Sequence, residues 1–325
     1  MADCHEKQKV AVVLFNLGGP DSLKAVKPFL FNLFYDPAII ALKNPLRWVV
    51  AKLISSRRAP IAKEIYKQMG GKSPILPQTE AQASALEELL NLSGDITYRC
   101  FISMRYWTPV SGETAQKVAA FTPDRIVLLP LYPHYSITTT GSSFIDWMKS
   151  AATAGLTMPY RAVRQYPDQE KYIAAQVKVI EDARVKLDHP ENYRILYSAH
   201  GLPEKIIEAG DPYRDQIEMT CRLVQEKLGN PDHMLCFQSR VGPLKWIEPY
   251  TEDAIKQTVS DDKGIIIVPI AFVSEHSETL VELDIEYREM ATELGAKDYV
   301  RVPAIGCQPE YIKALAHLTR SAFND

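Results

Sequence analysis

VAVVLFNLGGPD, residues 10–21, carries the clearest structural signal in the chain, because an unbroken apolar run ends abruptly in two glycines, a proline and an aspartate. Such a run predicts a strand that is buried on both faces, as in a parallel sheet. The residues that follow, 21–34, have the apolar spacing of a helix, which Asp21 or Ser22 can cap. The stretch is therefore typical of a strand, a tight turn and a helix in an α/β domain.

The same alternation continues through the rest of the chain. Further strands are expected at 98–104, 125–131, 192–198, 234–237, 264–271 and 299–302, and helices at 111–120, 212–227, 278–294 and 310–319. Strands that alternate with helices in this way predict parallel sheets covered by helices on both faces.

An internal sequence repeat divides the chain into two halves. YRILYSAHGLPE (193–204) repeats the pattern of residues 10–21, and IIIVPIAFVSEHS (265–277) repeats that of IVLLPLYPHYS (126–136). We expect an α/β fold of two similar Rossmann-like, doubly wound halves, residues 1–165 and 166–325, with an active-site cleft between them. The alternative is that any two strand–helix units look alike. Ligands of such sheets bind at the carboxyl ends of the strands, where both echoed loops fall.

The composition excludes several classes of function. With 325 residues, 46% hydrophobic and 24% charged, the chain is an ordinary globular protein. Its net charge of −3 provides no basic field for nucleic acid. No leader-like segment and no run of about 20 apolar residues is present, from which we expect a cytoplasmic protein. Neither a disulfide framework nor a zinc knuckle is indicated by the cysteines, which are odd in number and never spaced as CxxC: Cys4, Cys100, Cys221, Cys236 and Cys307.

Two motifs point to chemistry. His200 directly follows a predicted buried strand, where a neutral imidazole can accept a proton or bind a metal, although a lone histidine can also be structural. Glu278, Glu282 and Glu286 are spaced by four residues and would form one stripe on an α-helix. Apolar residues occupy the rest of this helix, which indicates burial, and buried unpaired carboxylates need a cation or a proton path. The alternative is a solvated acidic face.

Two further segments suggest the shape of the ligand. Residues 44–60, from Asn44 to Pro60 (NPLRWVVAKLISSRRAP), combine an apolar face with basic flanks, which suits a membrane surface or an amphipathic anion, or alternatively a helix packed in the core. Residues 238–246 and 105–107 place aromatic and guanidinium groups at the same sheet edge, as a wide planar ligand with carboxylates requires. The glycine pair at 18–19 is only weak support for a nucleotide-dependent enzyme.

Together these segments resemble the ferrochelatase family, in the family's order over nearly the whole chain. The resemblance is carried by FNLGGPDSL (15–23), RRAPIAKEIYKQMGGKSPI (57–75), MRYWTP (104–109), LYPHYSITTTGSS (131–143), SAHGLPEKIIEAGDPY (198–213), QSRVGPLKWIEPYTEDAI (238–255) and FVSEHSETLVELDIEY (272–287). It implies insertion of Fe²⁺ into protoporphyrin IX to give protohaem with release of two protons, the last step of haem biosynthesis.

The resemblance also implies roles for particular residues. His200 would be the active-site histidine and Glu278 the carboxylate opposite it, both as metal ligands, with Glu282 and Glu286 continuing the acidic line. Residues 44–60 resemble the apolar lip of the porphyrin cleft and imply peripheral contact with a membrane. The porphyrin site would be lined by Leu17, Arg58, Tyr66, Arg105, Tyr106, Gln238, Ser239 and Trp246.

The reaction fits these residues, because a porphyrin must lose two N–H protons as the metal enters. We expect His200 to accept one of them, and the acidic line to carry protons or hydrated iron. Some family members hold a [2Fe–2S] cluster through cysteines in a C-terminal extension. Since Cys307 is alone near the end of this chain, no cluster and no tightly bound cofactor are expected. The alternatives are a chelatase for coproporphyrin, cobalt or nickel, and a porphyrin or haem carrier without catalysis.

Overall fold

Two parallel sheets of four strands each form the framework of the protein, whose computed structural model describes residues 7–94 and 96–323. The first sheet has the order β2-β1-β3-β4 and contains β1 (Gln8–Asn16), β2 (Ile96–Met104), β3 (Arg125–Pro130) and β4 (Tyr160–Ala162). The second has the order β6-β5-β7-β8 and contains β5 (Tyr193–His200), β6 (His233–Gln238), β7 (Gly264–Pro269) and β8 (Tyr299–Arg301). The two orders follow the same pattern, so the expectation of two Rossmann-like halves is confirmed. The boundary at residues 165 and 166 stays a prediction.

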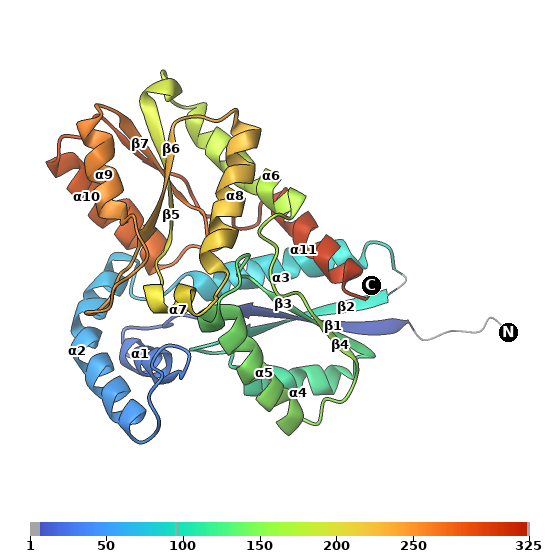
Figure 1. The fold of residues 1–325 in the computed structure, drawn as a ribbon. Coiled ribbons are helices and arrows are strands. Elements are labelled where there is room, and N and C mark those ends of the chain that lie inside the picture. Colours follow the sequence, from blue (N-terminus) through green and yellow to red (C-terminus); the bar gives the residue numbers. More distant parts are fainter. Residues whose placement is uncertain (1–6, 95, 324–325) are drawn as a thin grey trace.

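Helices cover both sheets, and Figure 1 shows the blue-to-green half below the yellow-to-orange half. The first half contains α1 (Val26–Tyr35), α2 (Leu46–Gln68), α3 (Ile75–Asn91), α4 (Ser111–Phe121), η1 (Ile137–Gly141) and α5 (Ser142–Thr153). The second contains α6 (Glu170–Arg184), η2 (Pro190–Asn192), α7 (Glu204–Glu208), α8 (Tyr213–Leu228), α9 (Thr251–Ser260), η3 (Glu278–Glu286), α10 (Tyr287–Glu293) and α11 (Pro309–Ser321). The last helix, α11, returns to pack against α3 of the first half.

The apolar strands supply a core that both halves share. On β1, Val10, Val12 and Leu14 face one cluster while the residues between them face another, as the alternation of side chains along a strand requires. On β7, Ile266 and Val268 face the same first cluster from the second sheet. Burial on both faces explains the continuous apolar runs of the inner strands β1, β3 and β7.

Two local expectations from the sequence are wrong. The helix expected from residue 21 begins at Val26, and neither Asp21 nor Ser22 caps it. The Asp21 carboxylate instead accepts a hydrogen bond from the Trp107 indole at 3.0 Å. The segment 278–294, expected as one α-helix, begins as the π-helix η3 and becomes α-helical only at Tyr287.

The glycine pair after β1 has a packing role. Gly18 adopts a φ of +84°, a conformation that L side chains rarely adopt. A Cβ atom on Gly19 would lie 2.5 Å from the Ser73 hydroxyl oxygen. These contacts account for both glycines without a phosphate group.

Helix α2 presents small residues to the protein and large apolar residues to solvent. Ala51, Ser55 and Ala59 recur every four positions on its buried face. The exposed large side chains of its first half are Leu46, Trp48, Val49 and Leu53. The alternative of a core-packing helix is therefore wrong for these side chains. None of the helices within the described residues combines the length and apolar character needed to cross a bilayer.

Candidate active site

The carboxyl ends of β5 and β6 bring the first site residues together. His200 and Gln238 end these two strands and lie opposite each other in the parallel register. The Gln238 side chain is fixed from β5, because the Ser198 hydroxyl donates to its Oε1 at 2.7 Å. Its amide nitrogen then points to η3 and donates to Glu282 Oε2 at 3.1 Å.

The His200 imidazole has a defined tautomer. Its Nδ1 lies 2.6 Å from the carbonyl oxygen of Gly201, and since a carbonyl only accepts, Nδ1 must carry the proton. In the neutral ring, Nε2 then carries a lone pair and no proton. Nε2 lies 3.8 Å from Glu278 Oε1, so the imidazole and the carboxylate face each other. The Trp246 ring packs beside the imidazole with its centroid 6.1 Å away.

Glu282 is the most strongly held member of the acidic line. Its carboxylate accepts from the Ser239 backbone at 2.9 Å, from the Ser239 hydroxyl, and from Tyr287 and Gln238 at 3.1 Å each. Burial raises the pKa of Glu282, and the neighbouring Glu278 carboxylate raises it further, against the opposing effect of these donors. The residue therefore favours holding a proton more than an exposed glutamate does.

The acidic line runs from the interior to solvent. Glu278 and Glu282 are partly buried, whereas Glu286 is exposed, so the expectation that burial extends along the whole line is wrong at its far end. At the inner end, the Glu278 backbone donates to His276 Nδ1 at 3.1 Å. Tyr66 from α2 is buried beside Glu278. Burial, with a smaller contribution from that carboxylate, raises the pKa of Tyr66 to about 12.

A second cluster lies at the carboxyl end of β2 in the first half. Arg105 forms an ion pair with Asp36 at 2.8 Å and donates from Nε to the Ser142 hydroxyl at 2.6 Å. The Tyr106 hydroxyl donates to the same Asp36 carboxylate at 2.9 Å, and Ser142 also donates to it. Leu17 joins this cluster through its carbonyl, which accepts from the Tyr106 backbone at 3.0 Å.

The predicted site residues thus fall into two groups and two exposed outliers, Arg58 and Glu286. The first group gathers at the ends of the second sheet and at η3, with Tyr66 contributed by α2: His200, Glu278, Glu282, Gln238, Ser239, Trp246 and Tyr66. The second group is Leu17, Arg105 and Tyr106. Arg58 is exposed on α2, with its guanidinium 5.9 Å from the Phe34 ring centroid.

Sequence reasoning missed four residues of these clusters: Asp36, Ser142, His276, and Tyr213, whose hydroxyl donates to the His200 carbonyl at 3.0 Å. Asp36 had a usable signal, because it is the single charged residue in residues 28–42 and so was a candidate for a buried ion pair. His276 is held neutral, since burial lowers its pKa. Ser142 and Tyr213 lie in ordinary polar surroundings of the sequence, and no local pattern marks them.

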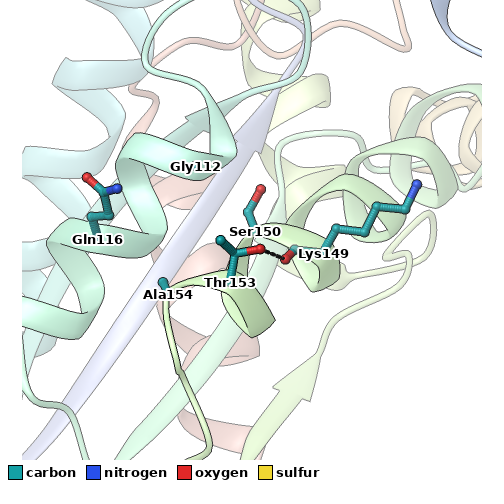
Figure 2. A pocket seen from close by; sticks show the side chains of 6 residues that line it. All are labelled: Gly112, Gln116, Lys149, Ser150, Thr153 and Ala154. Atoms are coloured by element: carbon teal, nitrogen blue, oxygen red, sulfur yellow. Dashed lines mark hydrogen bonds between the residues drawn. The ribbon is translucent and has the colours of Figure 1, made fainter.

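Other candidate sites are weaker. No three His, Cys, Asp or Glu side chains of residues 7–94 and 96–323 converge as a metal-ligand set. The cysteines in this part of the chain are free thiols, and Cys4 lies outside the described residues; the expected absence of an iron–sulfur cluster stays a prediction. A hollow of about 210 Å³ between α4 and α5 is lined by Gly112, Gln116, Lys149, Ser150, Thr153 and Ala154 (Figure 2), none of which belongs to either cluster.

Solved structures with a similar fold include SirB and a protein described as structurally similar to chelatases. SirB from Bacillus subtilis with Fe³⁺ superposes with a TM-score of 0.58 at 14% identity, covering 98% of this chain and 96% of that one. DR2241 from Deinococcus radiodurans, described as structurally similar to chelatases, superposes with a TM-score of 0.54 at 12% identity over 98% of this chain and 56% of that one. At these identities the likeness establishes the fold alone.

Sequence relatives establish the family. The family model described as Ferrochelatase matches residues 9–323. A protein named ferrochelatase from Caulobacter vibrioides (strain NA1000 / CB15N) is 53% identical over 317 residues, which cover 97% of this chain and 90% of that protein. A second, from Pelagibacter ubique (strain HTCC1062), is 50% identical over 95% of this chain and 90% of its own length. The chain belongs to the ferrochelatase family.

Proposed function

We propose that this chain inserts Fe²⁺ into protoporphyrin IX where His200 faces the acidic line of η3, releasing two protons and giving protohaem. Membership of the family supports the reaction. The observation that supports the assignment of residues is that His200 Nε2, the ring nitrogen left without the proton, lies 3.8 Å from Glu278 Oε1. Iron is a substrate in this reaction.

The two protons that the porphyrin loses determine the steps that the residues must perform. A free porphyrin carries two inner N–H protons, and both must leave before four pyrrole nitrogens can hold the metal. His200 Nε2 accepts one of these protons as a general base, because its Nδ1 proton is already committed to Gly201. Glu278 stabilises the resulting imidazolium. Glu282 and the exposed Glu286 then provide a path along η3 by which this proton leaves, so that Nε2 can accept the second, or by which hydrated iron arrives.

The test is anaerobic metallation followed by the Soret and visible bands. With protoporphyrin IX and Fe²⁺, His200→Ala should lose at least about 10²-fold in kcat, while porphyrin binding changes little. Glu278→Gln should lower kcat more than porphyrin affinity. The exposed His189 and Glu289 provide matched controls, since His189→Ala and Glu289→Gln should retain wild-type turnover. Normal turnover by His200→Ala would remove His200 from the mechanism.

The same assay separates the alternative functions. A porphyrin carrier binds porphyrin and shifts its bands, but it does not accelerate metallation. A chelatase of different specificity turns over coproporphyrin faster than protoporphyrin, or cobalt or nickel faster than iron. The apolar character of α2 favours the more apolar dicarboxylate porphyrin.

We also propose that the exposed apolar face of α2 touches the cytoplasmic face of a membrane. Trp48 is 43% exposed and Leu53 is 49% exposed, and Lys52 lies over the Trp48 ring at 4.6 Å. The doubly substituted Trp48→Ser/Leu53→Ser protein should sediment less with anionic phosphatidylglycerol vesicles than wild type. Leu92→Ser/Val185→Ser is the matched control, because these side chains are even more exposed elsewhere on the surface. Equal sedimentation of the two variants would contradict the assignment.

A further inference from the structure

The peptide group that joins His200 to Gly201 is held on both of its polar atoms. The Tyr213 hydroxyl donates to the His200 carbonyl at 3.0 Å. On the other side, the Gly201 N–H donates to the Gln238 carbonyl at 2.9 Å. A Cβ on Gly201 would lie 3.2 Å from both Gln238 O and Trp246 Cε3, so the backbone is also enclosed sterically.

This peptide group controls the imidazole. The acceptor of the His200 Nδ1 proton is the next carbonyl along the chain, that of Gly201. Its direction depends on the orientation of the peptide group before it. Holding this peptide group restrains the acceptor, which lies one residue further along the chain, and the acceptor selects both the tautomer and the direction of Nε2.

Tyr213 is itself positioned from the other half of the molecule. Asp211 Oδ1 accepts from the Tyr213 N–H at 3.1 Å. Asp211 Oδ2 accepts from the Ser136 hydroxyl at 3.0 Å and from the Ile137 N–H at 2.8 Å, both at the start of η1 in the first half. One carboxylate therefore joins η1 to the start of α8, whose first residue reaches His200.

We propose that Asp211 and Tyr213 are positioning residues that connect η1 of the first half to the imidazole of His200. The inference rests on the proposed role of His200 as the base. Asp211 joins the two halves, Tyr213 carries the connection to the His200 carbonyl, and the Gly201 carbonyl selects the tautomer that leaves Nε2 free. The assembled halves thereby determine whether the base is correctly oriented.

The first test removes one hydroxyl group. Tyr213→Phe keeps the ring, which packs edge-to-face on His134 with centroids 6.2 Å apart. We expect kcat to fall about tenfold with little change in KM for porphyrin, because small misplacements of a catalytic group are costly. In ¹⁵N-histidine-labelled protein, the His200 ring signals, assigned with His200→Ala, should move from the single Nδ1–H tautomer toward a mixture.

Tyr197→Phe is the matched control. Tyr197 is a fully buried tyrosine of β5 whose hydroxyl accepts from Gln225 of α8 at 2.8 Å, without contact to the His200 peptide group. Both variants lose one buried hydroxyl between β5 and α8, so a similar fall in Tm is expected. Only Tyr213→Phe should change kcat and the His200 ring signals.

The second test addresses the connection between the halves. Asp211→Asn supplies one acceptor and one amide donor where three donors converge, so the Ser136, Ile137 and Tyr213 contacts cannot all be kept. It should reproduce the kcat loss and the altered His200 signals. Asp215→Asn, which changes an exposed carboxylate in the first turn of α8, should behave as wild type.

The outcomes distinguish the two proposals. If His200→Ala is inactive while Tyr213→Phe and Asp211→Asn keep wild-type kcat and His200 signals, the positioning inference is overturned and the role of His200 stands. If His200→Ala is fully active, both are overturned. If Tyr197→Phe loses as much kcat as Tyr213→Phe, the effect is general loosening and the inference fails.

Discussion

Two arginines predicted for the same role have different surroundings. Arg105 is committed to the nearly buried Asp36 and to Ser142, so its guanidinium is already neutralised and oriented within the protein. Arg58 is exposed beside Phe34. An arginine that recognises a carboxylate of an incoming ligand needs free donors. This favours Arg58 as the ligand-binding residue and Arg105 as a support for the Tyr106 segment.

Alanine variants should separate the two roles. Arg58→Ala should raise KM for protoporphyrin about fivefold, the order of an exposed ion pair, with little effect on stability. Arg105→Ala should lower the free energy of unfolding by about 3 kcal/mol, because it leaves the buried Asp36 carboxylate short of a partner. Steady-state kinetics and urea unfolding measure both. If Arg105→Ala raises KM at unchanged stability, Arg105 reaches the ligand after all.

At the scale of elements, η3 shows what the sequence pattern can and cannot predict. A spacing of four residues predicts one acidic stripe on an α-helix. The wider i→i+5 turn of a π-helix also keeps such residues near one side, so the pattern could not separate the two helix types. A spacing of four also places Arg288 beside Asp284, at 2.5 Å, whereas no local spacing relates Asp284 to Arg301, which reaches it from β8 at 3.1 Å.

The pairing of Asp284 anchors η3 to the sheet. Burial alone raises the pKa of Asp284, but Arg288 and Arg301 outweigh that effect and hold it below its usual range. Asp284→Asn should therefore lower the free energy of unfolding at pH 7 by about 1–2 kcal/mol. A carboxylate whose pKa is lower in the folded protein stabilises the fold at pH values above its unfolded pKa, and this stabilisation is lost on acidification. The difference in stability between Asp284→Asn and wild type should therefore fade below about pH 4.

Glu286→Gln is the control for this anchor, because it neutralises an exposed carboxylate of the same helix. Its free energy of unfolding should stay within about 0.5 kcal/mol of wild type. Chemical denaturation at pH 7 and at about pH 3 provides the comparison, since the effect of Asp284 fades only below about pH 4. An equal loss for the two variants would mean that general charge on η3, rather than the arginine pairs, sets its stability.

At the scale of the molecule, the sequence predicted the repeated halves but not how they join. Apolar strands and the echo of residues 10–21 in 193–204 are local patterns, and the identical strand orders confirm them. The seam, by which we mean the contact of residues 134–137 with residues 211–220, brings together backbone and side-chain groups more than 70 positions apart. No periodicity records such pairs, which is why Asp211 and Tyr213 were missed while His200, at a strand end, was found.

His134 is the titratable group buried in this seam. Its Nε2 lies 2.9 Å from the Thr220 hydroxyl, whose own proton goes to the Pro167 carbonyl at 2.7 Å, so Nε2 is the donor. Nδ1 is buried without a hydrogen-bond partner in the described structure. Burial lowers the pKa of His134 to about 3, so the folded protein holds this ring neutral.

Acid should therefore weaken the seam through His134. Between the unfolded pKa of about 6.5 and the folded value, the unfolded chain binds one more proton than the native protein, so the free energy of unfolding falls as the pH falls. At pH 5 this cost is about 2 kcal/mol relative to pH 7.5. His134→Gln keeps an N–H donor for Thr220 and does not titrate. Its stability should drop about 2 kcal/mol less over this interval, in urea titrations at each pH, whereas the exposed His189→Gln should keep the wild-type slope. If the free energy of unfolding of His134→Gln and of wild type fell in parallel with pH, groups other than His134 would cause the acid destabilisation.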